Sequence, residues 1–390
     1  MRVEAVELRV VALPLLTPFV AAHGEVTVRT AVLVRVLGPD GEGWGECAAL
    51  PEPTYSAEYT EEARLTLRDH LVPRLLGANG AAGGPGVTSS DVVTLLADVV
   101  GHPMAKAALE LALLDAEGHA EGRPLAALLA PHPPGPATTV PAGVAIGLLD
   151  GPDAVADAVA ARMAEGYGRV KLKIAPGRDV AHVRAARQAG GPDLVLVADA
   201  NGAYRWDGEP GAPDDARRLA ELDELGLACL EQPLGADDLL DHVELAHRLA
   251  TPICLDESLT SPALTEEALD MGACSVVCVK APRYGSWWAA ADVLDRCHGN
   301  GVKAWVGGML DTGIGRLANV ALAAHPGATL PGDLSSTAHL FTADVTPFLS
   351  VERDSSGSGR LAVPATPGLG ATPDPDQLEA LTVAVELLRR

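Results

Sequence analysis

Short β-rich runs separated by helical segments recur at a regular spacing through most of the chain. They lie at 140–146, 168–173, 194–199, 227–231, 253–256, 275–280 and 302–307. The spacing of about 25 to 30 residues is the length of one strand plus one returning helix. A further run near 329–330 could supply an eighth unit. No glycine-rich nucleotide-binding turn follows these runs, so we predict a parallel α/β barrel rather than an open doubly wound sheet.

The segment before this series has a different pattern. Residues 3–13 alternate, 29–37 form a β-rich run, and the turn at 38–41 returns the chain along 43–46. Helical patterns follow at 56–76 and 104–121. We therefore predict an α+β capping domain over 1–130, a proline-rich linker at 131–136 and the barrel over 137–345. We expect the tail, 346–390, to pack on the capping domain and to end as a helix over 377–390.

Five consecutive predicted strands end in ionisable residues. The sequences are KLK at 171–173, VLVADAN at 195–201, CLEQP at 229–233, ICLDES at 253–258 and VVCVK at 276–280. Charged side chains at the end of a buried strand are costly unless they are paired or bind a metal. Because barrel enzymes place their sites at the C-terminal strand ends, a site built from Lys171, Lys173, Asp199, Glu231, Asp256 and Lys280 is favoured over a set of unrelated surface charges.

The residue types suggest the chemistry of this site. Carboxylates that converge without His or Cys suit a hard divalent ion, Mg²⁺ before Mn²⁺, and we assign Asp199, Glu231 and Asp256 as its ligands. Lys171 and Lys173 are two residues apart on one strand and point to the same face. We expect a second ammonium and a nearby cation to favour the neutral amine at Lys173, as a base requires. The site then fits removal of a proton α to a carboxylate.

Other polar residues near the strand ends receive supporting roles. Asn201 shares the face of Asp199 and could bond to a metal ligand or to substrate, although a turn-stabilising role is equally compatible. Glu257 could be a partner for Lys280 or Lys173. Gly307 and Gly308 could let substrate approach the backbone, or could simply form a turn. Loops that could cap the barrel mouth contain the residues Phe19, His23 and Tyr55.

Composition limits the partners. The 390 residues include 52 acidic and 29 basic side chains, a net charge of −23. Such a field repels a phosphate backbone, so we expect no nucleic-acid partner. We expect no membrane partner, since no apolar stretch of about 18 residues occurs. The six cysteines fit buried free thiols in a cytoplasmic protein better than a disulfide or zinc site. We expect a small-molecule carboxylate substrate and a homo-oligomer of undefined size.

Motifs over most of the chain resemble one family. They are GEGWGEC (41–47), MAKAALELALLDAE (104–117), GYGRVKLKI (166–174), DAN (199–201), LEQPL (230–234), TPICLDES (251–258), WVGGMLDTGIGRLANVAL (305–322) and LPGD (330–333). The chain resembles the muconate-lactonizing branch of the enolase superfamily, in its o-succinylbenzoate synthase / N-acylamino-acid racemase group. This resemblance implies a (β/α)₇β TIM-like barrel with a capping domain completed by the C-terminal tail.

The resemblance also implies roles for single residues. Asp199, Glu231 and Asp256 would bind Mg²⁺, Lys173 and Lys280 would be the acid/base pair, and Lys171 would modulate them. Arg283 stands where this group has an arginine associated with racemisation. The loop before Arg283 departs from the group's KPGRxGG pattern, and Asp311 replaces a glutamate in the GGMxETG motif. Neither departure touches an expected metal ligand.

The function implied by the resemblance is that of an o-succinylbenzoate synthase, a carbon–oxygen lyase of menaquinone biosynthesis. It would dehydrate 2-succinyl-6-hydroxy-2,4-cyclohexadiene-1-carboxylate. Racemisation of N-acylated, especially N-succinyl, amino acids is the alternative, alone or as a second activity. Dipeptide epimerisation or lactonisation on the same scaffold is a further alternative. A non-catalytic metal-binding barrel is a more distant one.

Overall fold

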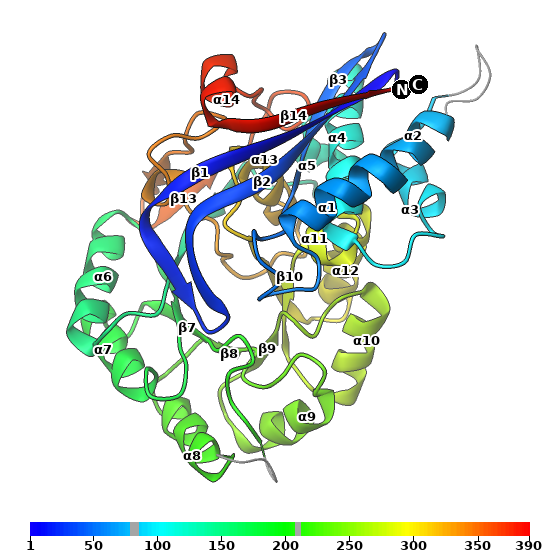
Figure 1. Ribbon diagram of the computed structural model, residues 1–390. Coiled ribbons are helices and arrows are strands. Elements are labelled where there is room, and N and C mark those ends of the chain that lie inside the picture. Colours follow the sequence, from blue (N-terminus) through cyan, green and yellow to red (C-terminus); the bar gives the residue numbers. More distant parts are fainter. Residues whose placement is uncertain (79–85, 207–211) are drawn as a thin grey trace.

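Two large sheets organise the fold in the computed structural model, which describes residues 1–78, 86–206 and 212–390. Figure 1 shows an antiparallel sheet, the cap, lying across one end of a ring of parallel strands and helices. The long hairpin of β1 (Ala5–Ala21) and β2 (Gly24–Gly38) bends down over that ring. The architecture is the predicted one, an α/β barrel with an α+β cap.

The cap sheet has the strand order β14-β1-β2-β3, with β3 at Gly41–Cys47 and β14 at Thr382–Arg389. Gly43 and Gly45 let β3 lie directly on a cap helix, because a Cβ atom at either position would come within 2.1 Å of a backbone oxygen of that helix. The cap helices are α1 (Thr60–Thr66), η1 (Leu67–Leu71), α2 (Val72–Ala78), η2 (Ser89–Asp91), α3 (Val92–Leu95), α4 (Pro103–Glu121) and α5 (Leu125–Leu129). The expected helices over 56–76 and 104–121 are present, the first beginning four residues later.

The expected helix over 377–390 is wrong for most of its length. Only α14, Pro375–Leu381, is helical, and the chain then continues as β14. This strand pairs antiparallel with β1, in a register that runs from Ala5 opposite Arg389 to Val11 opposite Thr382. The open edge of β1 offers unpaired backbone groups, and satisfying them outweighs the local helical pattern. The tail therefore completes the cap sheet, as expected.

The barrel strands run parallel in chain order. They are β5 (Gly143–Ile146), β6 (Arg169–Lys173), β7 (Val195–Asp199), β8 (Cys229–Glu231), β9 (Ile253–Leu255), β10 (Val276–Val279) and β11 (Lys303–Val306). Each overlaps one predicted run. The first run, 140–146, also contains β4 (Thr139–Pro141), which joins β12 (Val351–Arg353) and β13 (Gly359–Ala362) in a small separate sheet.

An extended segment closes the ring where an eighth strand was expected. The Leu330 N–H donates to Ala304 O of β11 at 3.0 Å, and the Gly143 N–H of β5 donates to Leu334 O at 3.0 Å. Gly332 lies so close to β11 that a Cβ atom there would come within 2.3 Å of Val306 O. The segment is not a regular strand, but it hydrogen-bonds to both edges of the sheet.

Helices cover the outside of the barrel and follow the strands in sequence. They are α6 (Pro152–Ala164), α7 (Val180–Gly190), α8 (Ala212–Asp223), α9 (Leu239–Arg248), α10 (Pro262–Met271), α11 (Ala281–Tyr284), α12 (Trp287–Gly299), α13 (Gly313–Ala323) and η3 (Thr337–His339). Their inner faces share one large apolar core with the outward faces of the strands. The cap has a core of its own.

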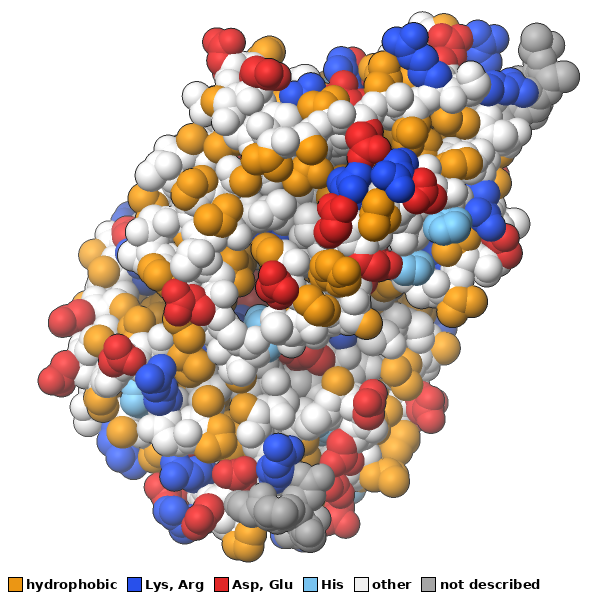
Figure 2. Space-filling view, in the orientation of Figure 1, with side chains coloured by type: hydrophobic (Ala, Val, Ile, Leu, Met, Phe, Trp, Pro, Cys, Tyr) orange, Lys and Arg blue, Asp and Glu red, His pale blue; other side chains and the backbone are white. Residues whose placement is uncertain are grey.

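The cysteines are placed as the sequence analysis predicted. All six cysteines are buried and free. On the face that Figure 2 shows, acidic and basic side chains are intermixed over the cap. Within the described part of the chain, every helix is too short or too polar to cross a membrane.

Candidate active site

The charged strand ends meet at one end of the barrel, under the cap. Lys171 and Lys173 lie on β6, Asp199 and Glu231 are the last residues of β7 and β8, and Asp256 and Lys280 directly follow β9 and β10. All six side chains are buried. The structure thus brings together every residue on which the predicted site depends. It is the parallel direction of the strands that places these ends at one edge.

Lys171 and Lys173 share one carboxylate. The Nζ atoms of Lys171 and Lys173 lie 2.9 Å and 2.7 Å from Asp199 Oδ2. Burial works against ionisation of Asp199, but the two ammonium groups outweigh it and hold its pKa below the usual range. The shared face of the two lysines is as expected from their spacing.

Lys171 is surrounded by acceptors. Besides Asp199, its Nζ atom lies 2.9 Å from Glu231 Oε1 and 2.5 Å from Asp333 Oδ2. Burial alone favours the neutral amine, but the three carboxylates together raise the pKa of Lys171 well above its usual value. Arg169, on the same strand, pairs with Asp333 and stacks 4.3 Å from the centre of the Trp305 ring. Lys171 is therefore a fixed cation.

Lys280 stands on the other side of the cavity. Its Nζ atom lies 2.6 Å from Asp256 Oδ2, and it donates to Tyr55 OH at 3.1 Å. Burial favours the neutral amine here as well, but Asp256 raises the pKa of Lys280 above its usual value. Three strands separate β6 from β10 in the sheet order, so Lys173 and Lys280 lie across the barrel from each other.

Asn201, Glu257 and Arg283 form a second layer around the lysines. Asn201 accepts a hydrogen bond from Lys173 Nζ through Oδ1 at 2.7 Å and donates through Nδ2 to Glu257 Oε1 at 2.7 Å. Asn201 has a positive φ of 45°, an uncommon backbone conformation at the end of β7. Glu257 therefore reaches Lys173 through Asn201, whereas Arg283 donates to Tyr55 OH at 3.0 Å and to the Glu257 carbonyl.

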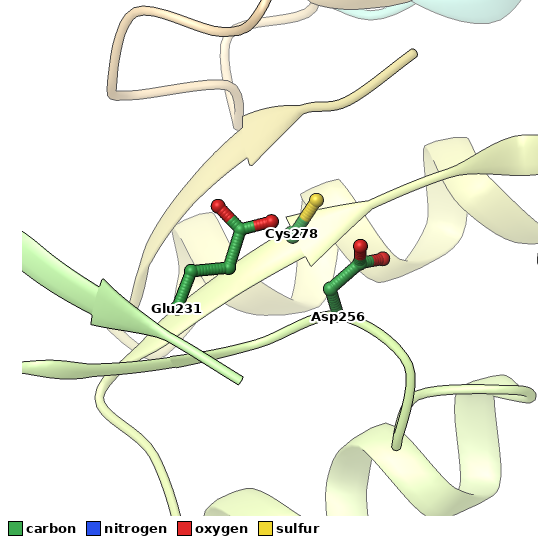
Figure 3. A group of neighbouring side chains, drawn as sticks. All are labelled: Glu231, Asp256 and Cys278. Carbon is green, nitrogen blue, oxygen red and sulfur yellow. The ribbon is translucent and has the colours of Figure 1, made fainter. Parts of the chain in front are cut away.

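Two carboxylates and a thiol form a compact donor group. One oxygen each of Glu231 and Asp256 and the Sγ atom of Cys278 lie within 4.8 Å of one another, and Figure 3 shows the three side chains converging from neighbouring strands. Among the described residues, Glu231 Oε2 and Asp256 Oδ1 are buried oxygens without a hydrogen-bond partner. Burial next to Asp199 raises the pKa of Glu231 well above its usual value. A divalent cation would satisfy both oxygens and relieve this repulsion.

The compact donor group contains two of the three predicted metal ligands. The predicted ligands are the carboxylates of Asp199, Glu231 and Asp256. In the structure Cys278 lies beside Glu231 and Asp256. The Asp199 carboxylate instead faces Lys171 and Lys173. Alternation accounts for Cys278, because it stands two residues before Lys280 and faces the barrel interior. Burial raises the pKa of the Cys278 thiol.

The glycines after β11 make room for protein atoms. A Cβ atom at Gly307 would lie 2.8 Å from both Cys278 Sγ and Lys280 Cε, and one at Gly308 would lie 2.5 Å from Asp311 Oδ2. The Lys280 side chain thus occupies the space at Gly307 that the sequence analysis gave to substrate. Gly308 does line the cavity.

Residues of the cap close the cavity over the lysines. The wall combines Phe19, His23 and Tyr55 of the cap with Met309, Leu310, Arg316, Asp333, Ser335 and His339 of the barrel. Burial, together with Lys173, lowers the pKa of His23 to about 4. The loops that the sequence suggested as barrel caps do lie over the site, and the cavity is partly apolar and partly cationic.

Sequence reasoning missed several of these residues. Asp333 lies within the irregular eighth segment, so no regular strand end indicates it. Gln232 is the uncharged residue after Glu231, and its Oε1 atom accepts from the backbone N–H groups of Asp256 and Ser258 at 3.1 and 3.2 Å. That contact fixes the turn that carries Asp256. Gln232 also has a positive φ of 37°, which no sequence pattern indicated.

Comparison with protein families places both parts of the chain. Residues 5–130 match the mandelate racemase / muconate lactonizing enzyme N-terminal domain, and residues 154–377 match the enolase C-terminal domain-like family. An N-succinylamino acid racemase of an Amycolatopsis species is 44% identical over 98% of each chain. An o-succinylbenzoate synthase of Geobacillus kaustophilus is 37% identical, covering 100% of this chain and 98% of that protein.

The fold also matches solved structures over nearly the whole chain. An enolase superfamily member from Listeria innocua superposes with a TM-score of 0.89 at 34% identity, over 100% of this chain and 99% of the other. A mandelate racemase-like protein from Alicyclobacillus acidocaldarius gives a TM-score of 0.86 at 37% identity, over 99% of each chain. Cap and barrel are therefore arranged as in these proteins.

Proposed function

Because this chain belongs to the enolase superfamily, in the group of o-succinylbenzoate synthases and N-acylamino-acid racemases, we propose that it is a metal-dependent o-succinylbenzoate synthase. The observation that carries the proposal is the pair of buried lysines, Lys173 and Lys280, facing each other across one cavity beside a carboxylate cluster. That arrangement supports removal of a proton α to a substrate carboxylate. Two relatives that bear the synthase name are similar over 98% and 94% of their length.

Glu231 and Asp256 are proposed to hold the metal, with Asp199 as the third carboxylate. Their unsatisfied oxygens and close approach support this assignment. Bound there, Mg²⁺, or Mn²⁺ in its place, would supply positive charge that favours loss of the proton α to the substrate carboxylate. The same assignment for Asp199 requires its carboxylate to turn from the two lysines toward Glu231.

Lys173 is the proposed base. Lys171 contacts three carboxylates and stays charged, whereas Lys173 contacts one carboxylate and the amide oxygen of Asn201. Of the two, Lys173 is held by fewer carboxylates, and we therefore assign the proton transfer to it. In the dehydration, Lys173 Nζ takes the α-proton and then delivers it to the departing hydroxide, which leaves as water. Lys280 stays cationic over the substrate.

N-succinylamino acid racemisation is the second candidate. It is favoured by the 44% identity to the Amycolatopsis racemase and by the position of Lys280, which can serve the opposite face of the α-carbon. Racemisation requires a proton acceptor on both faces. Both reactions share their first half, removal of the α-proton.

The two candidates are separated by steady-state kinetics. We expect kcat/KM to be higher for the cyclohexadiene precursor of o-succinylbenzoate than for an N-succinyl amino acid, and EDTA to abolish both activities. The control is the EDTA-treated enzyme restored with Mg²⁺. A larger kcat/KM for the amino acid would overturn the synthase assignment while leaving the site intact. Metal-independent turnover would overturn the metal assignment.

The lysine roles are tested by exchange of the α-hydrogen in D₂O, with both enantiomers of an N-succinyl amino acid. We expect Lys173→Ala to lose exchange from one enantiomer and Lys280→Ala from the other, each by at least about 10²-fold. Lys303→Ala is the matched control, because Lys303 is exposed at the first residue of β11. Equal loss for both enantiomers in each variant would contradict separate faces.

A further inference from the structure

Three thiols form a layer under the charged strand ends. Cys229, Cys254 and Cys278 each stand two residues before a charged residue, in the sequences CLE, CLD and CVK. Alternation along a strand puts both members of each pair on the inner face. The three cysteines lie in the barrel interior with Val197, Val276 and Trp305. They are therefore the first side chains beneath the proposed metal ligands.

Only one of the three thiols joins the carboxylates. Among the described residues, the compact donor group contains Cys278 but neither Cys229 nor Cys254. Gly307 contributes to this geometry, because a Cβ atom there would lie 2.8 Å from Cys278 Sγ. Without a side chain at position 307, the sulfur keeps its place beside Glu231 and Asp256.

The two carboxylates leave room for a ligand in this group. Glu231 and Asp256 are 0% and 1% exposed, and each has a buried oxygen, Oε2 and Oδ1, without a hydrogen-bond partner. The two unpartnered oxygens indicate a cation site without reference to the cysteine. The chemistry of two carboxylates and a thiol determines which cations this group selects.

Hard and soft divalent cations prefer different donor atoms. Mg²⁺ is bound by oxygen, and a thiol adds nothing to its site. Borderline and soft ions such as Co²⁺, Zn²⁺ and Cd²⁺ bind thiolate sulfur as well, with a Zn–S distance of about 2.3 Å. A site that holds both donor types therefore distinguishes these two classes of ion.

We propose that Cys278 is a ligand for thiophilic divalent cations, which bind through its sulfur together with Glu231 and Asp256 and displace Mg²⁺. As the metal–sulfur bond forms, the Cys278 S–H bond breaks and the proton goes to solvent or buffer, so no redox change is involved. The inference rests on the proposed metal site and deepens it. Thiophilic ions then occupy this centre in a mixed oxygen–sulfur coordination that hard ions do not use.

The experiment is a titration of the metal-free full-length protein with Co²⁺, followed by its near-ultraviolet sulfur-to-metal charge-transfer absorption. Metal analysis of the same samples gives the bound Co²⁺. We expect the absorption in the wild type and its loss in Cys278→Ser. Cys254→Ser is the matched control, a buried thiol of the same layer outside the donor group, and it should retain the absorption. Added Mg²⁺ should reduce the absorption only at a large excess over Co²⁺.

The outcomes distinguish failure of the Cys278 assignment from failure of the proposed metal site. Co²⁺ bound by the wild type without charge-transfer absorption, or absorption that persists in Cys278→Ser, would overturn the role of Cys278 and leave the proposed function standing. Failure of the wild type to bind either Co²⁺ or Mg²⁺ would instead remove the proposed metal site. If Cys278→Ser does not fold, cadmium NMR of the wild type decides, because a resonance in the oxygen-only range would overturn sulfur ligation.

Discussion

Gly307 has no side chain, and the space that a Cβ atom would need is filled by Lys280 and Cys278. The Cβ atom of Gly307→Ala would lie 2.8 Å from Lys280 Cε, and the Lys280 Nζ atom is already held by Asp256. The lysine must move, and displacement of a reacting group by about 1 Å can cost on the order of 10² in rate. We expect Gly307→Ala to lower kcat by tenfold to hundredfold, roughly, in the same steady-state assay.

Gly299→Ala is the control for this prediction. A Cβ atom at Gly299, the last residue of α12, meets no other atom within 4 Å. Alanine is also the better helix former, so this variant should keep its kcat and its stability. Equal kcat values for Gly307→Ala and Gly299→Ala would show that Lys280 tolerates the added methyl group.

The sequence predicted the residues of the site better than their contacts. Lys171, Lys173, Asp199, Glu231, Asp256 and Lys280 could be placed because each ends a strand with a clear apolar run. Tyr55 could be placed only near the barrel mouth. Its hydrogen bonds to Lys280 and Arg283 depend on how the cap sits on the barrel, and no local pattern encodes that. The same holds for Asp333, whose partners lie on a distant strand.

At the scale of elements, the N-terminus of barrel helix α12 is hydrogen-bonded to a carboxylate of the cap. Glu110 of α4 accepts hydrogen bonds from Ser286 Oγ at 2.7 Å and from the Trp287 N–H. Burial outweighs these bonds and raises the pKa of Glu110 to about 7. The unfolded chain ionises this group near 4.5. At pH values between these two pKa values, Glu110 holds its proton in the folded state but not in the unfolded state. The free energy of unfolding therefore falls as pH rises.

We expect Glu110→Gln to flatten this pH dependence. The wild type should lose stability between about pH 4.5 and 7, with a contribution from Glu110 of up to about 1.4 kcal/mol per pH unit. Urea unfolding across this range measures it. Glu58, whose pKa is also raised to about 7 by burial, stays in every variant and cancels in the difference. Exposed Glu121 of the same helix gives the control Glu121→Gln, and equal slopes in all three proteins would contradict the prediction.

Elements were predictable where one sequence pattern dominated. The seven strands and helix α4 were found because their apolar runs are long or regular. The predicted helix over 377–390 is correct only up to Leu381, because pairing with the edge of β1 decides the structure of Thr382–Arg389. The eighth unit was expected near 329–330 as a strand, but its hydrogen bonds close the ring without a regular strand. Both cases depend on partners far away in the chain.

At the scale of the whole molecule, a buried ion pair joins the cap to the barrel. Glu46 of β3 accepts from the Thr312 hydroxyl at 2.7 Å, from the Thr312 N–H at 3.1 Å and from the Gly315 N–H at 2.8 Å, at the start of α13. Arg29 of β2 lies 3.4 Å from Glu46 Oε1 and donates to Leu310 O at 3.1 Å. Leu310 lines the cavity with a positive φ of 56°. This contact therefore connects the cap sheet, the barrel and the wall of the site.

Breaking this contact should affect stability and catalysis together. Glu46→Ala leaves Arg29 as an uncompensated buried charge and uncaps α13, which should lower the free energy of unfolding by about 3–5 kcal/mol. Because the segment from Thr312 to Gly315, which follows Leu310 in the cavity wall, then loses its hydrogen bonds to the cap, we expect KM to rise as well. Glu42→Ala is the matched control, since Glu42 lies on the same strand but pairs with Arg35 within the cap and is partly exposed. It should cost no more than about 1 kcal/mol and leave KM unchanged. If the two variants unfold at the same urea concentration and share one KM, cap and barrel are held together by their apolar contacts, and the buried pair only fills space between them.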